Sequence, residues 1–334
     1  MKSNKESISI IAEIGSIHDG SIGNALKAID VASDAGANIV KFQTHIAEAE
    51  SLPNAPSPNF FNAESRIDYF RRTAFSLEQW IKIAEHCKSK NVEFLSSPFS
   101  LEAIELLEKV GVSSYKIPSG EVTNHPLLER ISETSKCVYL SSGMSDWFEL
   151  DEAIKILNKS NKLIPMQCTS SYPCDPESVG LNIIREMSER YNLPVGFSDH
   201  TLGFAAAISA VALGCVVIEK HFTFSKLMYG SDAAHSMEPK EFKLFCDAIK
   251  EAAVIRDSKV DKNNLVEFKE MKSIFQKSIV TSRDLKKGDL LCNNDISFKK
   301  PGNGISASRY KEIIGKRLNK DMPENIQISW GDLT

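Results

Sequence analysis

The feature that most constrains this chain is an alternation of short β-branched runs with longer amphipathic segments over about 250 residues. The strand-like runs are Ser9–Gly15, Ile39–Thr44, 92–98, 114–119, 137–142, 163–169, 195–198 and 216–222, and helix-like segments lie between them and after the last. This pattern indicates parallel strands joined by helical crossovers. Eight such units predict a (β/α)8 (TIM) barrel. An open doubly wound sheet is the alternative, but no G-x-G-x-x-G follows the first run.

One connection between the predicted strands is unusually long. It runs from Ile46 to Phe75 and contains Pro53, Pro56 and Pro58, followed by Phe60, Phe61, Tyr69 and Phe70. Long loops in compact domains often act as lids over a site. A solvated excursion is the alternative, but the aromatic residues indicate that the segment packs against the protein.

The composition changes after residue 255, where the barrel pattern ends. We assign residues 1–255 to the barrel domain and the polar stretch 256–274 to a linker. Residues 275–334 show short strands and turns without another long helix, which predicts a small β-rich domain. A domain of this size has a thin core, so we expect it to lean on a barrel.

The overall charge and composition exclude several classes of protein. The net charge of −4 provides no basic field for nucleic acid or an anionic membrane. The apolar stretch 8–12 ends at Glu13, too soon for a secretory signal, and no run is long enough to span a membrane. The seven cysteines are scattered without a C-x-x-C, so we expect reduced thiols in a cytoplasmic protein.

Polar and ionisable residues gather where the predicted strands end, which is the active-site face of a barrel. They are Glu13; Lys41 and Gln43; Ser96 and Ser97; Lys116, Ser119 and Glu121; Ser141 and Ser142; Thr169, Ser170 and Tyr172; Ser198, Asp199 and His200; and Glu219, Lys220 and His221. Core packing accounts for any one of them, but not easily for lysines on two strands and histidines on two others.

The two strand lysines, Lys41 and Lys116, are flanked by apolar residues. A buried ammonium needs a partner, so each lysine either pairs with a carboxylate or serves an anion. The hydroxyls of Ser97 and Ser119 would complete a cradle for phosphate or carboxylate. A Lys–Glu pair across the barrel floor is the alternative.

The histidines His200 and His221 end successive strands. Two imidazoles with carboxylates nearby make a plausible site for Mn, Mg or Zn. A lone histidine at such a place is more often a general base or a hydrogen-bonded core residue. His235 is either a third ligand or exposed, and we interpret His45, His86 and His125 as structural or surface residues.

At these residues the chain resembles the sialic acid synthase family, the bacterial synthases of N-acetylneuraminic, legionaminic and pseudaminic acids. The resemblance extends from Ile11 to about Leu333. Its motifs are Ala-Glu-Ile-Gly (12–15), Val-Lys-Phe-Gln (40–43), Tyr-Lys-Ile-Pro-Ser-Gly-Glu (115–121), Leu-Ser-Ser-Gly-Met (140–144), Cys-Thr-Ser-Ser-Tyr-Pro (168–173), Gly-Phe-Ser-Asp-His-Thr (196–201), Ile-Glu-Lys-His-Phe (218–222), Gly-Ser-Asp (230–232) and Lys-Lys-Pro-Gly-Asn-Gly (299–304). Each motif is weak alone, and their order and spacing make the match specific.

The resemblance implies a (β/α)8 barrel followed by an antifreeze-like (SAF, β-clip) domain, which swaps across a homodimer to close the partner's site. It implies condensation of phosphoenolpyruvate with an N-acylated aldose at a divalent metal, Mn or Mg, with release of phosphate. By position, His200 and His221 match the metal ligands and Glu13 matches the catalytic acidic residue. Lys41, Lys116, Ser119 and Ser198 match phosphoenolpyruvate-binding positions, to which we add Ser97; Gln43, Glu121, Tyr172, Asp232 and Lys300 match sugar-binding positions.

Three departures from the family pattern affect the prediction. Lys300 replaces an arginine, Ser170 stands where an asparagine can occur, and His18-Asp19-Gly20 stands where His-Asn-Gly is common. The first two concern sugar recognition, and they favour a diacetamido sugar slightly over ManNAc. A barrel-type pyruvate lyase, with Lys116 or Lys220 as the Schiff-base lysine, is a rival interpretation. A non-catalytic sugar-binding protein is another.

Overall fold

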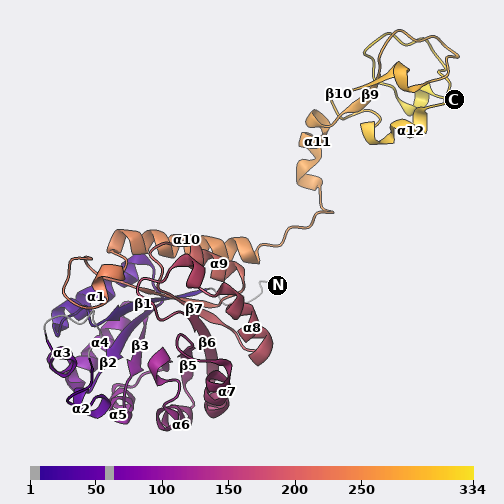
Figure 1. The fold of residues 1–334 in the computed structure, drawn as a ribbon. Coiled ribbons are helices and arrows are strands. Elements are labelled where there is room, and N and C mark those ends of the chain that lie inside the picture. The colour runs from indigo at the N-terminus through magenta and orange to yellow at the C-terminus, as the bar shows by residue number, and fades with distance from the viewer. Residues whose placement is uncertain (1–7, 57–63) are drawn as a thin grey trace. The chain divides into compact units, whose positions relative to one another are not determined.

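The computed structural model describes residues 8–56 and 64–334 of the chain, which divides into two compact units, Met1–Ser258 and Lys259–Thr334. In the first unit eight parallel strands form a closed barrel in sequence order, surrounded by helices (Figure 1). The strands are β1 Ser9–Gly15, β2 Ile39–Thr44, β3 Glu93–Pro98, β4 Ser114–Ile117, β5 Cys137–Ser141, β6 Lys162–Cys168, β7 Gly196–Asp199 and β8 Val217–His221. The predicted barrel is therefore confirmed, and the open sheet is excluded.

The helices of this unit cover the outside of the barrel. They are α1 Ile22–Ala35, α2 Ala47–Glu50, α3 Arg66–Thr73, α4 Leu77–Ser89, α5 Leu101–Val110, α6 His125–Glu133, α7 Trp147–Ile156, α8 Leu181–Tyr191, α9 Ala205–Ala212 and α10 Pro239–Asp257. In the described parts of the chain, no helix has the length and apolar character that a membrane crossing requires.

Helix ends follow local sequence signals. The Ser21 hydroxyl caps the start of α1, and Gly36 ends it in the left-handed region at φ 107°. Ser76 and Gln79 form a capping box at the start of α4. Strand β4 ends at Ile117, two residues before the predicted end, because Pro118 has no N–H to continue the ladder.

Strand register places three predicted site residues at one level of the barrel. Glu13 on β1 pairs with Lys41 on β2 in one direction and with His221 on β8 in the other. Residues paired in a parallel sheet share a face, so these side chains are brought together by the closure of the barrel. The register shifts by one residue between Glu13 and Gly15, and Gly15 pairs with Phe42.

The barrel unit has two apolar layers. The larger lies between the strands and the helices, and the smaller fills the barrel interior beneath the polar strand ends. The interior layer consists of Ile11, Ile39, Leu95, Tyr139, Ile164, Met166 and Val217. It forms an apolar floor, so the polar residues above it are accessible only from the carboxyl ends of the strands.

The long connection after β2 contains α2 and α3. Ala47, Tyr69 and Phe70 are buried together there, in agreement with the expected packing of its aromatic residues. Pro58, Phe60 and Phe61 lie outside the described residues. The lid function of this segment remains a prediction.

The second unit is built on the antiparallel pair of β9 Ser278–Thr281 and β10 Ile296–Lys299, with α11 Lys269–Phe275 and α12 Tyr310–Ile313. Its own small core includes Ile279, Leu285, Leu291, Ile305 and Ile328. The β-rich character is as predicted. The predicted domain limits, 1–255, 256–274 and 275–334, stay a prediction; α10 ends at Asp257 and the division into units falls after Ser258.

Candidate active site

Most of the predicted site residues line one small cavity of about 100 Å³ at the carboxyl ends of the strands, here called the inner cavity. From the predicted set it contains Glu13, Lys41, Gln43, Ser97, Lys116, Ser119, Tyr172, Ser198, His200, His221 and Asp232. Phe99, Pro118, Ser141, Cys168 and Glu219 complete its lining. Residues from all eight strands or the loops after them therefore meet at the predicted face of the barrel.

Glu219 on β8 is the centre of the charge network in this cavity. Its Oε2 accepts a 2.7 Å hydrogen bond from Lys116 Nζ, and its Oε1 accepts one of 3.0 Å from the Ser198 hydroxyl. Lys41 Nζ lies 3.5 Å from Glu219 Oε1 and 3.1 Å from Glu13 Oε2. The Lys–Glu pairing considered from the sequence is therefore present. It does not exclude anion binding, because the same lysines line the cavity.

Burial and charge act in opposite directions on these groups. Burial lowers the pKa of Lys116, and the attraction of Glu219 only partly opposes this. Burial acts likewise on Lys41, but the carboxylates of Glu13 and Glu219 raise its pKa above the usual value. Burial would raise the pKa of Glu219, yet Lys116 and Lys41 hold it well below its ordinary range. Glu219 is therefore ionised, and the network contains two carboxylate–ammonium pairs.

Hydroxyl groups above the lysines are available to an anion. Ser97 Oγ is shielded from solvent and has no hydrogen-bond partner among the residues that the structure describes. Ser119 Oγ accepts a 3.0 Å hydrogen bond from the N–H of Gly143. A Cβ at Gly143 would lie 2.7 Å from Ser119 Oγ and 2.4 Å from Ser170 Oγ, so only glycine permits this approach. Buried hydroxyls beside two ammonium groups form the kind of cradle that phosphate or carboxylate occupies.

The two histidines lie side by side at the rim of the inner cavity, with ring centroids 5.5 Å apart. The Nδ1 of His200 is 2.8 Å from the carbonyl oxygen of Thr169, so it donates its proton there and leaves Nε2 with a free lone pair. Burial, followed by the nearby His221, lowers the pKa of His200 to about 3. A neutral imidazole with an oriented lone pair is what a metal requires.

Asp232 completes this side of the cavity. Its Oδ2 lies 3.9 Å from His221 Nδ1, and it approaches Gly15 so closely that a Cβ there would be 2.9 Å away. Within residues 8–56 and 64–334, no three His, Cys, Asp or Glu side chains are grouped as a metal site would need. His235 lines a neighbouring cavity and not this one.

A chain of hydrogen bonds extends outward from Glu13. Gln43 Nε2 donates to Glu13 Oε1 at 2.8 Å, Gln43 Oε1 lies 3.1 Å from His45 Nε2, and His45 Nδ1 lies 2.8 Å from Glu50 Oε2. Glu50 has no predicted role, and His45 is predicted to be a structural or surface residue. Because Glu50 fixes His45, and His45 fixes Gln43, these residues orient the amide that contacts Glu13.

A second cavity of about 250 Å³, here called the outer cavity, adjoins the inner one. The two share Gln43, Phe99, Tyr172 and Asp232. The remaining lining residues are Ser16, His45, Arg66, Tyr69, Phe70, Ser231 and His235. A ligand that reacts at Glu13 and is too large for the inner cavity would therefore extend into the outer cavity.

Three residues to which the sequence analysis assigned a binding or catalytic role, Glu121, Lys220 and Lys300, line neither cavity. Glu121 follows β4, accepts a 2.7 Å hydrogen bond from Asn124 Nδ2, and has its pKa raised by burial. Lys300 belongs to the second unit, where its Nζ lies 5.0 Å from the centroid of the Phe275 ring. Lys220 pairs with Asp199 at 2.8 Å and with Phe245 on α10, so it faces the helices.

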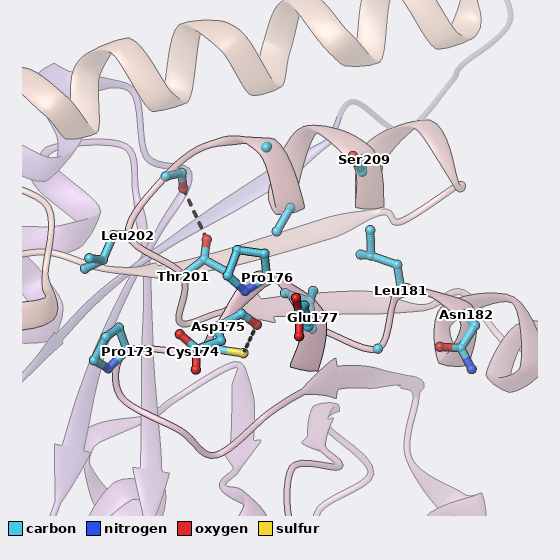
Figure 2. Close-up of a pocket in the computed structure, with 15 residues that line it drawn as sticks. Pro173, Cys174, Asp175, Pro176, Glu177, Leu181, Asn182, Thr201, Leu202 and Ser209 are labelled. Atoms are coloured by element: carbon cyan, nitrogen blue, oxygen red, sulfur yellow. Dashed lines mark hydrogen bonds between the residues drawn. The ribbon is translucent and has the colours of Figure 1, made fainter.

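A third cavity, of about 730 Å³ and thus larger than the inner and outer cavities, lies between the loops after β6 and β7 (Figure 2). Pro173, Asp175 and Glu177 line one side and Thr201 and Leu202 another, with α8 and α9 beyond. Within the described chain its lining includes no lysine, arginine or histidine. It therefore lacks the cations and bases that the inner cavity provides, and size does not identify the site.

Comparisons with known proteins agree with the fold. The chain matches the model of the NeuB family over residues 28–261 and that of the SAF domain over residues 276–334. It is 37% identical to the N,N'-diacetyllegionaminic acid synthase of Campylobacter jejuni, covering 95% of this chain and 97% of the relative. It is 32% identical to the pseudaminic acid synthase of the same species, covering 97% and 96%. A solved N-acetylneuraminic acid synthetase from Leptospira borgpetersenii superposes with a TM-score of 0.72 at 29% identity, covering 82% and 96%.

Proposed function

The chain belongs to the NeuB family and carries a SAF domain, and on that basis we propose that it is a nonulosonic acid synthase. It would condense phosphoenolpyruvate with the open-chain form of an N-acylated aldose and release phosphate, giving a nine-carbon acidic sugar. The names of its relatives, synthases of legionaminic and pseudaminic acids, support this reaction class. The observation that carries the proposal is the meeting of Glu13, two lysines and two histidines in one cavity.

In this proposal the lysines and hydroxyls hold phosphoenolpyruvate. Lys41 and Lys116 would exchange part of their contact with Glu219 for the phosphate and carboxylate, and Ser97 would donate its unused hydroxyl. Holding both reactants in register removes most of the entropic cost of a two-substrate reaction.

The bond-forming step joins carbon 3 of phosphoenolpyruvate to the aldehyde carbon of the sugar. Positive charge then develops at carbon 2, where the Glu13 carboxylate stabilises it. Gln43 holds one oxygen of Glu13, and the other, Oε2, lies 3.1 Å from Lys41 Nζ, so the carboxylate is held in place on the lining of the inner cavity. Water adds to carbon 2, and phosphate leaves from the tetrahedral adduct with its bridging oxygen.

The residues that would hold a divalent cation are His200 and His221. His200 offers a neutral imidazole whose Nε2 carries the lone pair, and His221 offers a second nitrogen, but no third His, Cys, Asp or Glu of the described chain is grouped with them. When bound, Mn²⁺ or Mg²⁺ would polarise the aldehyde oxygen as a Lewis acid. The charge of the cavity favours such an ion, because two ammonium–carboxylate pairs alone leave an added phosphoenolpyruvate anion uncompensated.

The remaining assignments concern the assembly and its location. We propose a homodimer in which the SAF domain of one subunit brings Lys300 to the sugar in the partner's barrel; Lys300 belongs to the second unit, whereas the residues that line the inner cavity belong to the first. All seven cysteines lie within the described ranges as free thiols, which supports a cytoplasmic location. Glu121 is retained as a sugar-binding candidate.

The test is a measurement of phosphate release from phosphoenolpyruvate with Mn²⁺, using ManNAc and a 2,4-diacetamido-trideoxyhexose as acceptors. We expect metal-dependent release with an N-acylated aldose, and a preference for the diacetamido sugar. The rival, a lyase with a lysine Schiff base, is favoured by one observation, the lowered pKa of buried Lys116. Borohydride reduction in the presence of pyruvate distinguishes the two, since only the lyase would retain a covalent adduct.

A further inference from the structure

Arg66, at the start of α3, lines the outer cavity with an unused hydrogen-bond donor. Its Nε is shielded from solvent and has no hydrogen-bond partner among the residues described. Its Nη2 lies 3.7 Å from Glu50 Oε1, within ion-pair range but too long for a hydrogen bond. A buried N–H without an acceptor is rare in folded proteins, so its position points to an acceptor supplied by a ligand.

The wall beside Arg66 is aromatic and rigid. The His45 ring is stacked between Phe70, at a centroid distance of 3.7 Å, and Phe99, at 4.1 Å. Glu50 holds the His45 ring at 2.8 Å, and the Arg66 guanidinium lies 5.4 Å from the centroid of Phe70. One N–H donor next to flat apolar rings matches an acylamino group, whose carbonyl oxygen accepts a hydrogen bond and whose methyl group packs on the rings.

The charge around Arg66 favours a neutral acceptor over an anion. Glu50 already faces the guanidinium, and Asp232 lines the same cavity. A phosphate placed there would meet the field of both carboxylates, whereas an amide carbonyl would not.

The position of the cavity defines which part of the substrate reaches Arg66. The reacting aldehyde carbon must lie in the inner cavity beside Glu13, and the two cavities join at Gln43, Phe99, Tyr172 and Asp232. The substituent at Arg66 is therefore remote from the reacting carbon. We propose that Arg66 and the rings of His45, Phe70 and Phe99 form a subsite for a second acylamino group of the aldose. This subsite rests on the proposed function.

The experiment compares kcat/KM for phosphate release with a 2,4-diacetamido-trideoxyhexose and with ManNAc in wild type, Arg66→Met and Arg66→Lys. Methionine keeps the apolar stem and removes every donor, and lysine keeps the charge but removes Nε–H. Arg71→Met, on the same helix and exposed, is the control. We expect Arg66→Met to lose at least about tenfold with the diacetamido sugar and less than about twofold with ManNAc. Arg66→Lys should also lose more of its kcat/KM with the diacetamido sugar than with ManNAc. Arg71→Met should have the kcat/KM of wild type with both sugars.

Equal losses with the two sugars, or no loss, in correctly folded variants overturn the subsite. Melting temperatures within a few degrees of wild type establish that folding is intact, and Arg66→Lys provides the test if Arg66→Met does not fold. A preference for a phosphorylated aldose that Arg66→Met abolishes would also overturn it, since the donor would then serve an anion. The proposed function fails separately, if wild type releases phosphate with none of these acylated aldoses.

Discussion

Lys116 Nζ lies 2.7 Å from Glu219 Oε2, and 2% and 5% of the two side chains are exposed to solvent. A buried ion pair of this kind is costly to break, because the remaining charge has lost its solvent and its partner. If phosphoenolpyruvate binds Lys116, then substrate and Glu219 compete for one ammonium group.

This competition leads to the first prediction. Glu219→Gln should lower the free energy of unfolding by about 3–5 kcal/mol without ligand, because Lys116 loses its counter-charge. Added phosphoenolpyruvate should raise the melting temperature more in the variant than in wild type, since the anion supplies the missing charge. Glu186→Gln, on the exposed face of α8, serves as the control. Equal ligand-induced shifts in the variant and wild type would argue that the anion binds elsewhere.

The second prediction concerns acid stability. Burial, followed by the charge of His45, lowers the pKa of His18 to about 4, below its ordinary value of 6.5. The unfolded chain therefore binds more protons between these values, so stability falls as pH decreases from about 6.5 to about 4. His18 accounts for up to about 3 kcal/mol of that loss.

Replacement of His18 should reduce this pH dependence. His18→Gln loses the contact with Phe75, whose ring lies 4.5 Å away, so it should be less stable than wild type at pH 7. The difference between the two proteins should shrink towards pH 4, as measured by urea unfolding at a series of pH values. A constant difference across this range would show that His18 does not control the acid transition.

The third prediction addresses the metal. Removal of divalent ions with EDTA should abolish phosphate release, and added Mn²⁺ should restore it. Mn²⁺ binding measured by electron paramagnetic resonance should be lost in His200→Ala and His221→Ala and kept in the exposed control His125→Ala. Full turnover after verified metal removal would contradict the assignment.

The fourth prediction tests the swapped dimer by complementation. A barrel lacking 275–334 and a full-length Glu13→Gln chain should each have little activity. Mixed and refolded together, they should regain activity, because the intact barrel of the first receives the SAF domain of the second. If the truncated barrel is fully active alone, the SAF domain has no part in the site.

The fifth prediction concerns Lys300, which presents one mobile ammonium where an arginine would present a planar donor set. Lys300→Arg should change kcat/KM for at least one of ManNAc and the diacetamido sugar by roughly tenfold, the effect of one buried hydrogen bond of about 1–3 kcal/mol. Lys311→Arg, also in the second unit, is the matched control. Unchanged values for both sugars would remove Lys300 from the sugar site.

The barrel and the location of its site at the carboxyl ends of the strands could be predicted, because they depend on the periodicity of apolar residues and on the direction of the strands. Strand ends alone, however, do not define which side chain faces the interior. Glu219 and Lys220 are consecutive, and the strand turns the first into the inner cavity and the second towards α10. Glu219 is predicted only as one of the polar residues at the strand ends, and Lys220 is a candidate nucleophile in the rival lyase interpretation, whereas the structure places Glu219 at the centre of the charge network.

Arg66, His45 and Glu50 were beyond sequence reasoning for a different reason. They belong to the connection after β2, where Glu50 ends the four-residue helix α2 and Arg66 begins α3, and helices this short give no clear periodicity from which to orient their side chains. Their arrangement depends on the packing of Phe70 and Phe99 against one ring, a contact between segments about thirty residues apart. The buried hydroxyl of Ser97 was predicted as a binding group, because its strand position alone places it at the site.

The apolar floor of Ile11, Leu95, Met166 and their neighbours closes the barrel interior at one end, so that the interior opens only at the carboxyl ends of the strands. Both reactants must enter through this one opening, and the product and phosphate must leave through it. If phosphoenolpyruvate binds Lys41 and Lys116 as proposed, it has to enter before the aldose, since a sugar bound nearer the opening would block its path. The fold therefore favours an ordered addition of the substrates, in which the bound aldose closes the opening and retains phosphoenolpyruvate in the barrel.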